Sequence, residues 1–444
     1  MTFVIVYINT FANTKSQIKM PARNHKKAKS APDSAPHKWE FKARFRRGAF
    51  GWKSEPAITR IKQAVSEFKK VARTDKTLAA EGSVIFLERL SPAIEHVDGS
   101  SGRIGSAVCE AIEELVSLIA SADVASEKRE KWLDRLWQAM IEDEIPYIET
   151  LGDHWGDLCE TTEIASSWAD KLIDTARMCW TSENAGSYFH GTMPCLSALF
   201  KAQRYDELFT LLKLDRHRLW DYQQFAAKAL AFTGKIDEAV EFANNHSGWH
   251  TDSVNVAATC EQILLEAGRV EEAYKHYAIS ANRQASNLTT FRTIKKKYGS
   301  IAPTRILQDL IAATPGEEGK WFATAKELKQ FDLAIKLAAT SPCDPRTLMR
   351  ASRDYRESNP DFAVQAGLSA LAWLFKGHGY EITNAEVLEA YDSAMQAAQA
   401  ADKEAQTYER ILEAVRFGLT EKNRVAQVLA KVLTSYSPTS APSR

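Results

Sequence analysis

The chain has 444 residues, of which 45% are apolar and 26% are charged, and its formal net charge is zero. This composition is ordinary for a soluble globular protein, and the length allows two or three compact domains or one long repeat array. Six cysteines without close pairs argue against a disulfide framework or a cysteine-based zinc site, and they indicate a reducing, cytoplasmic environment.

The zero net charge conceals a basic segment on an acidic body. Residues 15–76 hold 18 Lys and Arg against 5 Asp and Glu, whereas the rest of the chain holds 39 basic and 52 acidic residues. This asymmetry indicates either that the basic segment lies on the acidic body or that it meets an external anionic partner.

The first residues do not predict a membrane segment. The apolar run of residues 3–8 is far too short to span a bilayer, and no positive charge precedes it as in a secretory signal. We expect Met20 to be the working start, with residues 1–19 an upstream extension. Residues 20–37 combine Lys, Ala, Ser and Pro with almost no large apolar side chain, so they predict disorder.

Residues 38–46 alternate charged and apolar side chains. A period of two places Trp39, Phe41 and Phe45 on one side of an extended segment, and the basic side chains, Arg44 and Arg46 among them, on the other. We therefore expect residues 1–53 to form a disordered basic and aromatic arm.

From residue 58 the apolar spacing becomes that of helices. Apolar stripes with helical period run over residues 58–72, 84–97, 104–119, 132–140 and 164–176. Ser54 and Pro56 are placed as start signals of the first helix, and residues 98–102 form the loop between the second and third. Beyond residue 50 no segment predicts a strand.

A short phrase then recurs: Gly or another small or polar residue, one linking residue, a large apolar anchor, two residues, and Ala or a near equivalent. The anchors are Tyr205, Ile236, Val270, Ile301, Phe331 and Phe362, which lie 31, 34, 31, 30 and 31 positions apart. This period is typical of stacked helix pairs, in which each pair is too small to bury its apolar face alone. Gly234 and Gly268 suit the turn inside a pair, where φ is positive, and Pro303 suits a helix start.

The copy at residues 268–280, with Gly268, Val270, Ala273, Tyr274 and Tyr277, resembles the second half of a tetratricopeptide repeat. This resemblance covers residues 194–375 and implies an α-solenoid. The early aromatic of the first helix and the closing Pro of that repeat are missing from most copies. Residues 91–105 and 145–156 are similar to a bacterial family described only as a domain of unknown function, which implies a helical protein and no activity.

Motifs that could carry chemistry have simpler explanations. Gly99, Gly102 and Gly105 precede a helix but follow another helix, so they predict a turn rather than a phosphate-binding loop. His246, His250 and Asp252 could share a metal on a helix, but the surrounding Asn and Gly residues predict a loop. The acidic residues 142–144, 149, 153 and 157 around His154 are typical of a solvated face. The sequence therefore predicts no catalytic residue, no cofactor and no metal site.

Two basic groups remain as candidate partner sites. In the arm, Arg44, Arg46 and Arg47 could contact phosphates while Trp39, Phe41 and Phe45 stack on bases or insert at a membrane surface; alternatively, the aromatic residues dock on the first helices and the charges face water. In the fourth repeat, Arg292, Lys295 and Lys296 end the first helix. They form either a groove site for an acidic peptide or a solvated helix end.

Together these patterns predict an all-α protein: a disordered basic arm over residues 1–53, a helical region over 54–183, a tetratricopeptide-like solenoid over 184–434 and a loose tail over 435–444. We expect a non-enzymatic scaffold that presents a helical groove to a protein or peptide. The alternative is a nucleic-acid-associated repeat protein whose arm contacts phosphates. The sequence leaves its oligomeric state open.

Overall fold

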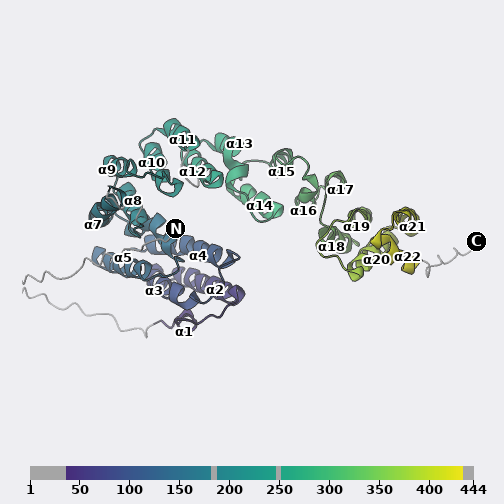
Figure 1. Ribbon diagram of the computed structural model, residues 1–444, viewed down its shortest axis with the longest axis horizontal. Helices are drawn as coiled ribbons and strands as arrows, with labels where there is room; N and C mark the ends of the chain where they lie inside the picture. The colour runs from purple at the N-terminus through teal and green to yellow at the C-terminus, as the bar shows by residue number, and fades with distance from the viewer. Residues whose placement is uncertain (1–36, 182–187, 247–251, 434–444) are drawn as a thin grey trace, which may run out of the picture. The chain divides into compact units, whose positions relative to one another are not determined.

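The computed structural model describes residues 37–181, 188–246 and 252–433. Within these ranges every regular element is helical, and helices that follow one another along the chain pack in pairs (Figure 1). The predicted all-α class is thus confirmed. The chain divides into two compact units, Met1–Asp252 and Ser253–Arg444, and this division lies inside the predicted repeat region.

The first unit begins with a bundle of long helices and continues into shorter helix pairs. A 3-10 segment, η1 (Glu149–His154), precedes the pairs. The helices of this unit are α1 Phe41–Arg44, α2 Ser54–Ala72, α3 Lys76–Ile94, α4 Arg103–Ala120, α5 Ser126–Ile141, α6 Trp155–Cys159, α7 Thr162–Thr181, α8 Thr192–Lys201, α9 Tyr205–Leu212, α10 Trp220–Phe232 and α11 Ile236–Asn244.

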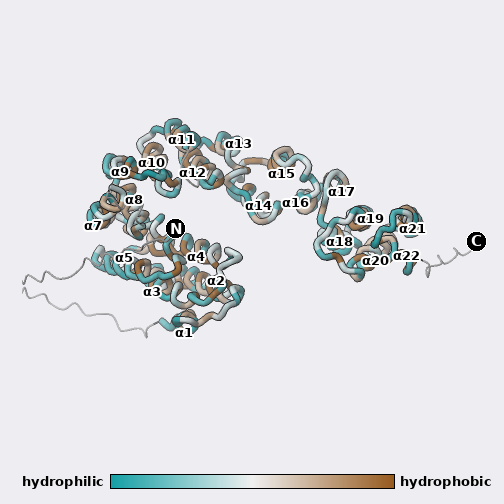
Figure 2. Tube along the Cα trace, in the orientation of Figure 1, coloured by the Kyte–Doolittle hydropathy of each residue, from teal (hydrophilic) through white to brown (hydrophobic). Residues whose placement is uncertain are grey.

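Helix α3 is the centre of the bundle, because α2, α4 and α5 all contact it. Its sequence explains this position: Val84, Leu87 and Leu90 are fully buried. The helix starts eight residues before the predicted stripe because Asp75 caps it, accepting a hydrogen bond from the Leu78 N–H at 2.8 Å. Hydrophilic and hydrophobic residues both occur along the individual helices (Figure 2), as expected of helices that bury one part of their surface and expose another.

The segment before α2 is not a disordered extended arm over residues 37–53, so that prediction is wrong there. Residues 41–44 form the short helix α1, and Trp39, Phe41 and Phe45 are 5%, 2% and 1% exposed. The three rings pack on α2 and α3, which is the docking alternative considered above. The rest of the predicted arm, residues 1–36, lies outside the described residues.

The second unit consists of short helices. One 3-10 segment, η2 (Glu318–Trp321), occurs in it. Its helices are α12 Ser253–Glu266, α13 Val270–Ala281, α14 Asn287–Lys297, α15 Pro303–Ala312, α16 Phe322–Glu327, α17 Phe331–Thr340, α18 Pro345–Asp354, α19 Pro360–Phe375, α20 Asn384–Ala400, α21 Glu404–Thr420 and α22 Arg424–Leu433.

The recurring phrase marks the start of the second helix of a pair. Helices α9, α11, α13 and α17 begin at the anchors Tyr205, Ile236, Val270 and Phe331 themselves. Two residues earlier the chain has positive φ, at Gln203, Gly234, Gly268 and Lys329. The expectation for Gly234 and Gly268 is confirmed.

Two anchors differ in detail. Phe362 lies inside the first turn of α19, and Ile301 lies in the turn before α15. Pro303 is the first residue of α15, as predicted, since its missing N–H is harmless there. The same backbone turn recurs without an apolar anchor before α21 and α22, where Asp402 and Lys422 have positive φ.

Helix pairs of the second unit also contact one another in register. Among the first helices, α14 contacts α16 and α18 contacts α20; among the second helices, α17 contacts α19 and α19 contacts α21. The Trp373 indole N–H of α19 donates to the Ala338 carbonyl of α17 at 2.6 Å. Across the described ranges, no helix combines the length and the apolar character needed to cross a membrane.

Candidate binding sites

Aromatic packing fixes the segment of residues 38–47 on the bundle. The Phe45 and Phe41 rings lie 4.8 and 5.5 Å from Phe86 of α3, and Trp39 lies 5.2 Å from Phe68 of α2. Edge-to-face rings at such distances stabilise a core. Trp39, Phe41 and Phe45 therefore cannot stack on a base or insert into a membrane while docked, and a partner-binding role for them stays a prediction.

The cations of the same segment are exposed. We define the basic face as Lys38, Lys42, Arg44, Arg46, Arg60 and Arg89, which come from the docked segment, from α2 and from α3. Arg89 donates to the Lys42 carbonyl at 3.4 Å, which ties α3 to this face. Arg47 lies at its edge and pairs with Glu95 at 3.4 Å. The structure thus brings the predicted Arg44 together with Arg60 at Gln63, and it ties Arg89 to the docked segment.

One amide oxygen on this face receives two guanidinium groups. Gln63 Oε1 accepts from Arg60 at 2.7 Å and from Arg44 at 3.2 Å. Arg44 also lies 3.4 Å from the exposed carboxylate of Glu40. Gln63 thus holds the two guanidinium groups near each other, and Glu40 offsets part of the Arg44 charge.

The predicted cluster at the end of α14 separates into different roles. Arg292 pairs with Glu327 of α16, with its Nε 3.0 Å from Oε2, so it links two first helices. Its role as a partner-binding residue stays a prediction. Lys295 and Lys296 are exposed, and the Lys295 ammonium lies 6.0 Å from the centre of the Phe291 ring. Of the predicted set, Lys295 and Lys296 are the two that have no carboxylate partner in the described part of the chain.

The next residues, Lys297 and Tyr298, both bond to a buried carboxylate, an arrangement that the sequence did not indicate. Glu261 of α12 is 1% exposed and accepts from Tyr298 at 2.6 Å, from Asn282 at 2.6 Å and from Lys297 at 2.7 Å. Burial, followed by the bond to Glu261, raises the pKa of Tyr298, so its hydroxyl stays a donor. The network joins α12, α13 and α14 and has a structural role.

The acidic cluster around His154 is not simply a solvated face. Asp143 is buried, accepts from the Ile148 N–H at 2.8 Å and bonds to Ser91. Burial raises the pKa of Asp143 and raises that of Asp153 to about 6. Asp143 holds the turn after α5 through these bonds, which is a structural role.

The predicted metal alternative at residues 246–252 lies partly outside the described residues, because His250 is not described. His246 is 9% exposed and packs against Trp220, with ring centres 5.0 Å apart. Within the described ranges no three metal-ligating side chains converge.

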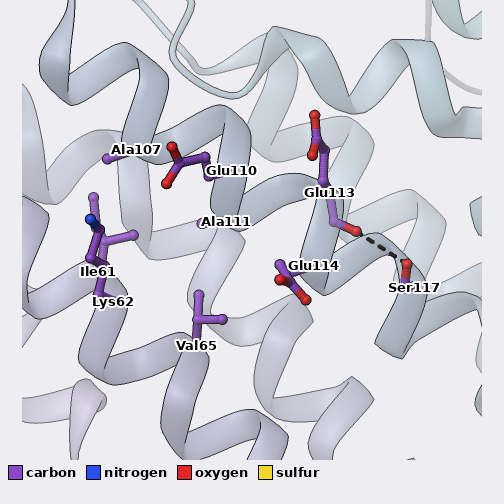
Figure 3. A pocket seen from close by; sticks show the side chains of 9 residues that line it. All are labelled: Ile61, Lys62, Val65, Ala107, Glu110, Ala111, Glu113, Glu114 and Ser117. Carbon is purple, nitrogen blue, oxygen red and sulfur yellow. Dashed lines mark hydrogen bonds between the residues drawn. The ribbon is translucent and has the colours of Figure 1, made fainter. Parts of the chain in front are cut away.

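A groove of about 530 Å³ runs between α2 and α4. Its floor is apolar, with Ile61, Val65 and Ala111, and its rim sets Lys62 of α2 against carboxylates of α4 (Figure 3). Lys69 pairs with Glu114 at 2.8 Å across it. Because the rim carries both positive and negative side chains, its charge does not indicate one class of ligand.

Comparison with protein-family models gives no match, and no curated protein matches the chain. The resemblances to tetratricopeptide repeats and to the family of unknown function stay predictions.

Proposed function

We propose that this protein is a non-enzymatic binding scaffold whose helix pairs stack as a tetratricopeptide-like solenoid and present their first helices to a protein or peptide. The observation that carries the proposal is the contact of first helix with first helix, α14 with α16 and α18 with α20, in the second unit. A row of such helices leaves a long surface that a partner segment can occupy through a few anchors. All six cysteines are free thiols, which supports a place in the cytoplasm.

The charges on the first helices indicate the chemistry of the partner. Ion pairs join neighbouring first helices: Arg292 with Glu327, and Arg346 with Glu386 at 2.6 Å. In the described part of the chain, Lys295 and Lys296 have no carboxylate partner, although both are exposed. An acidic peptide segment is the partner that these two cations favour.

The test is cross-linked capture of partners from native cells with the double variant Lys295→Glu, Lys296→Glu. Reversal of both charges on α14 places repulsion where attraction is proposed, so we expect specific partners to be lost. The matched control is Lys275→Glu, Lys336→Glu, which makes the same charge change at exposed positions of the second helices α13 and α17. Equal partner lists for both double variants would contradict the proposed surface.

A further inference from the structure

We propose that the basic face of the first unit binds the sugar-phosphate backbone of nucleic acid, with double-stranded nucleic acid as its preferred form. This surface lies on the docked segment, α2 and α3, and it is separate from the first-helix surface of the second unit. The proposal therefore does not depend on the scaffold function.

The strongest indication is the convergence of Arg44 and Arg60 on Gln63. A guanidinium group has five N–H donors, and Gln63 Oε1 takes one from each arginine, at 3.2 and 2.7 Å. A phosphate between the two would replace this neutral acceptor with anionic oxygens, which planar guanidinium groups can bind in bidentate geometry. Since the two side chains already lie together, little ordering is needed on binding.

The rest of the basic face extends the same charge. Lys38, Lys42 and Arg46 are exposed and have no carboxylate partner in the described part of the chain. Four of its six members are arginines, whose planar donors fit phosphate oxygens better than an ammonium does. Exposed cations of this kind neutralise several phosphates at once and release their counterions.

The sequence that precedes the face argues against the chain's own N-terminal segment as its occupant. Residues 15–36 contain six Lys and Arg and one Asp, so they would be repelled by the face and would add to its charge. An external polyanion would be attracted both to the basic face and to residues 15–36.

The buried aromatic residues decide which polyanion. Trp39, Phe41 and Phe45 are 5%, 2% and 1% exposed, so these three rings offer no surface on which an unpaired base could stack and no wedge for a lipid layer. What remains is contact with phosphates, which carries no sequence information. A duplex, with its two phosphate rows, is the ligand that such a rigid surface suits.

The test is fluorescence anisotropy with the full chain and a labelled 20-base-pair duplex over a series of salt concentrations. We expect the affinity to fall steeply with salt, and the double variant Arg44→Gln, Arg60→Gln to weaken binding by roughly tenfold or more and to reduce the slope of log K against log salt by about 2. Arg410→Gln, Arg416→Gln is the matched control, since both residues are exposed on α21 and the charge change is the same. Thermal melting of each variant checks that the fold is kept.

Further measurements separate this proposal from its alternatives. Trp52 is 72% exposed, and Trp52→Ala should leave duplex affinity unchanged within about twofold, because backbone contact does not use stacking. Single-stranded DNA of equal length should bind no more tightly than the duplex. The proposal is overturned if the Arg44, Arg60 variant binds like its control, if binding ignores salt, or if vesicles with anionic lipid bind while the duplex does not.

Discussion

At the scale of single residues, one glycine permits the docking of the N-terminal segment. A Cβ atom on Gly82 of α3 would lie 2.7 Å from Cη2 and 2.8 Å from Cε2 of Trp39. Gly costs a helix about 1 kcal/mol relative to Ala. At this position the cost is offset because the bare backbone lets the indole lie directly on α3.

We therefore expect Gly82→Ala to destabilise the protein by about 1–3 kcal/mol, since overpacking at Trp39 outweighs the gain in helix propensity. Gly105→Ala in α4 is the control, because no atom lies within 4 Å of its added Cβ, and it should stabilise by up to about 1 kcal/mol. Urea unfolding measures both. A Gly82→Ala protein as stable as the Gly105→Ala protein would show that Trp39 does not rest on Gly82.

A second residue, Asp153, makes stability depend on pH. Burial raises its pKa to about 6 in the folded chain, from 3.8. The folded state therefore holds this proton more firmly than the unfolded chain does. The resulting stabilisation is complete below about pH 4 and is lost as the pH rises through about 6.

Asp153→Asn removes this titration. We expect the variant to gain in free energy of unfolding relative to the natural chain as the pH rises from 4 to 7, and to show no further relative change above pH 7. Thermal or urea unfolding at several pH values measures the difference, with Asp134→Asn, an exposed position on α5, as the control. A difference independent of pH would contradict the shift at Asp153.

At the scale of elements, the left-handed turn inside the helix pair recurs in repeat copies whose sequences differ. Gly234 and Gly268 adopt it without strain, with φ of 84° and 74°. Gln203 and Lys329 adopt it with φ of 58°, at a cost of roughly 1 kcal/mol for a side chain.

Lys329→Gly should therefore stabilise the second unit by roughly 0.5–1 kcal/mol, and Gly268→Ala should destabilise it by a similar or larger amount. The melting temperatures of the two variants test the sign of each effect. If both substitutions raised or both lowered the melting temperature, the left-handed backbone conformation would not be the cause of the stability changes.

The same elements show what the sequence could and could not predict. The starts of α11 and α13 follow from Gly234 and Gly268, whereas the turns at Asp402 and Lys422 have no glycine and no apolar anchor, so the phrase does not reveal them. The sequence predicts an extended arm because a period of two places Phe41 and Phe45 on one side. A single helical turn does the same, since positions i and i+4 share a face. Nine residues cannot distinguish the two periods, and the packing of Trp39 on Gly82 of α3 belongs to the tertiary structure.

The basic face was predictable only in part, for a similar reason. Its charges are visible in the composition of residues 38–47, but Gln63, Arg60 and Arg89 join it through the packing of α2 and α3. Arg44 and Gln63 are 19 residues apart in the sequence, and Lys42 and Arg89 are 47 apart. No local sequence pattern indicates that residues so far apart lie close together in the fold.

At the scale of the whole molecule, the two units differ in how they are built. The first has a helical bundle with a central α3, and the second has short helices that contact near neighbours along the chain. Units with their own internal contacts are expected to fold separately.

A chain of residues 253–444 alone should therefore be helical and should unfold cooperatively in urea, because its helices make their contacts within Ser253–Arg444. Circular dichroism measures both properties. An unstructured fragment would show that the second unit needs the first to fold.

The docking of Trp39, Phe41 and Phe45 beneath a charged surface has one more consequence. Sulfate salts strengthen the burial of apolar groups, whereas any salt weakens the attraction between cations and phosphates. Ammonium sulfate should therefore hold the N-terminal segment more tightly on its bundle while it releases a bound polyanion. A ligand could be washed from this surface under conditions that make the surface itself more rigid.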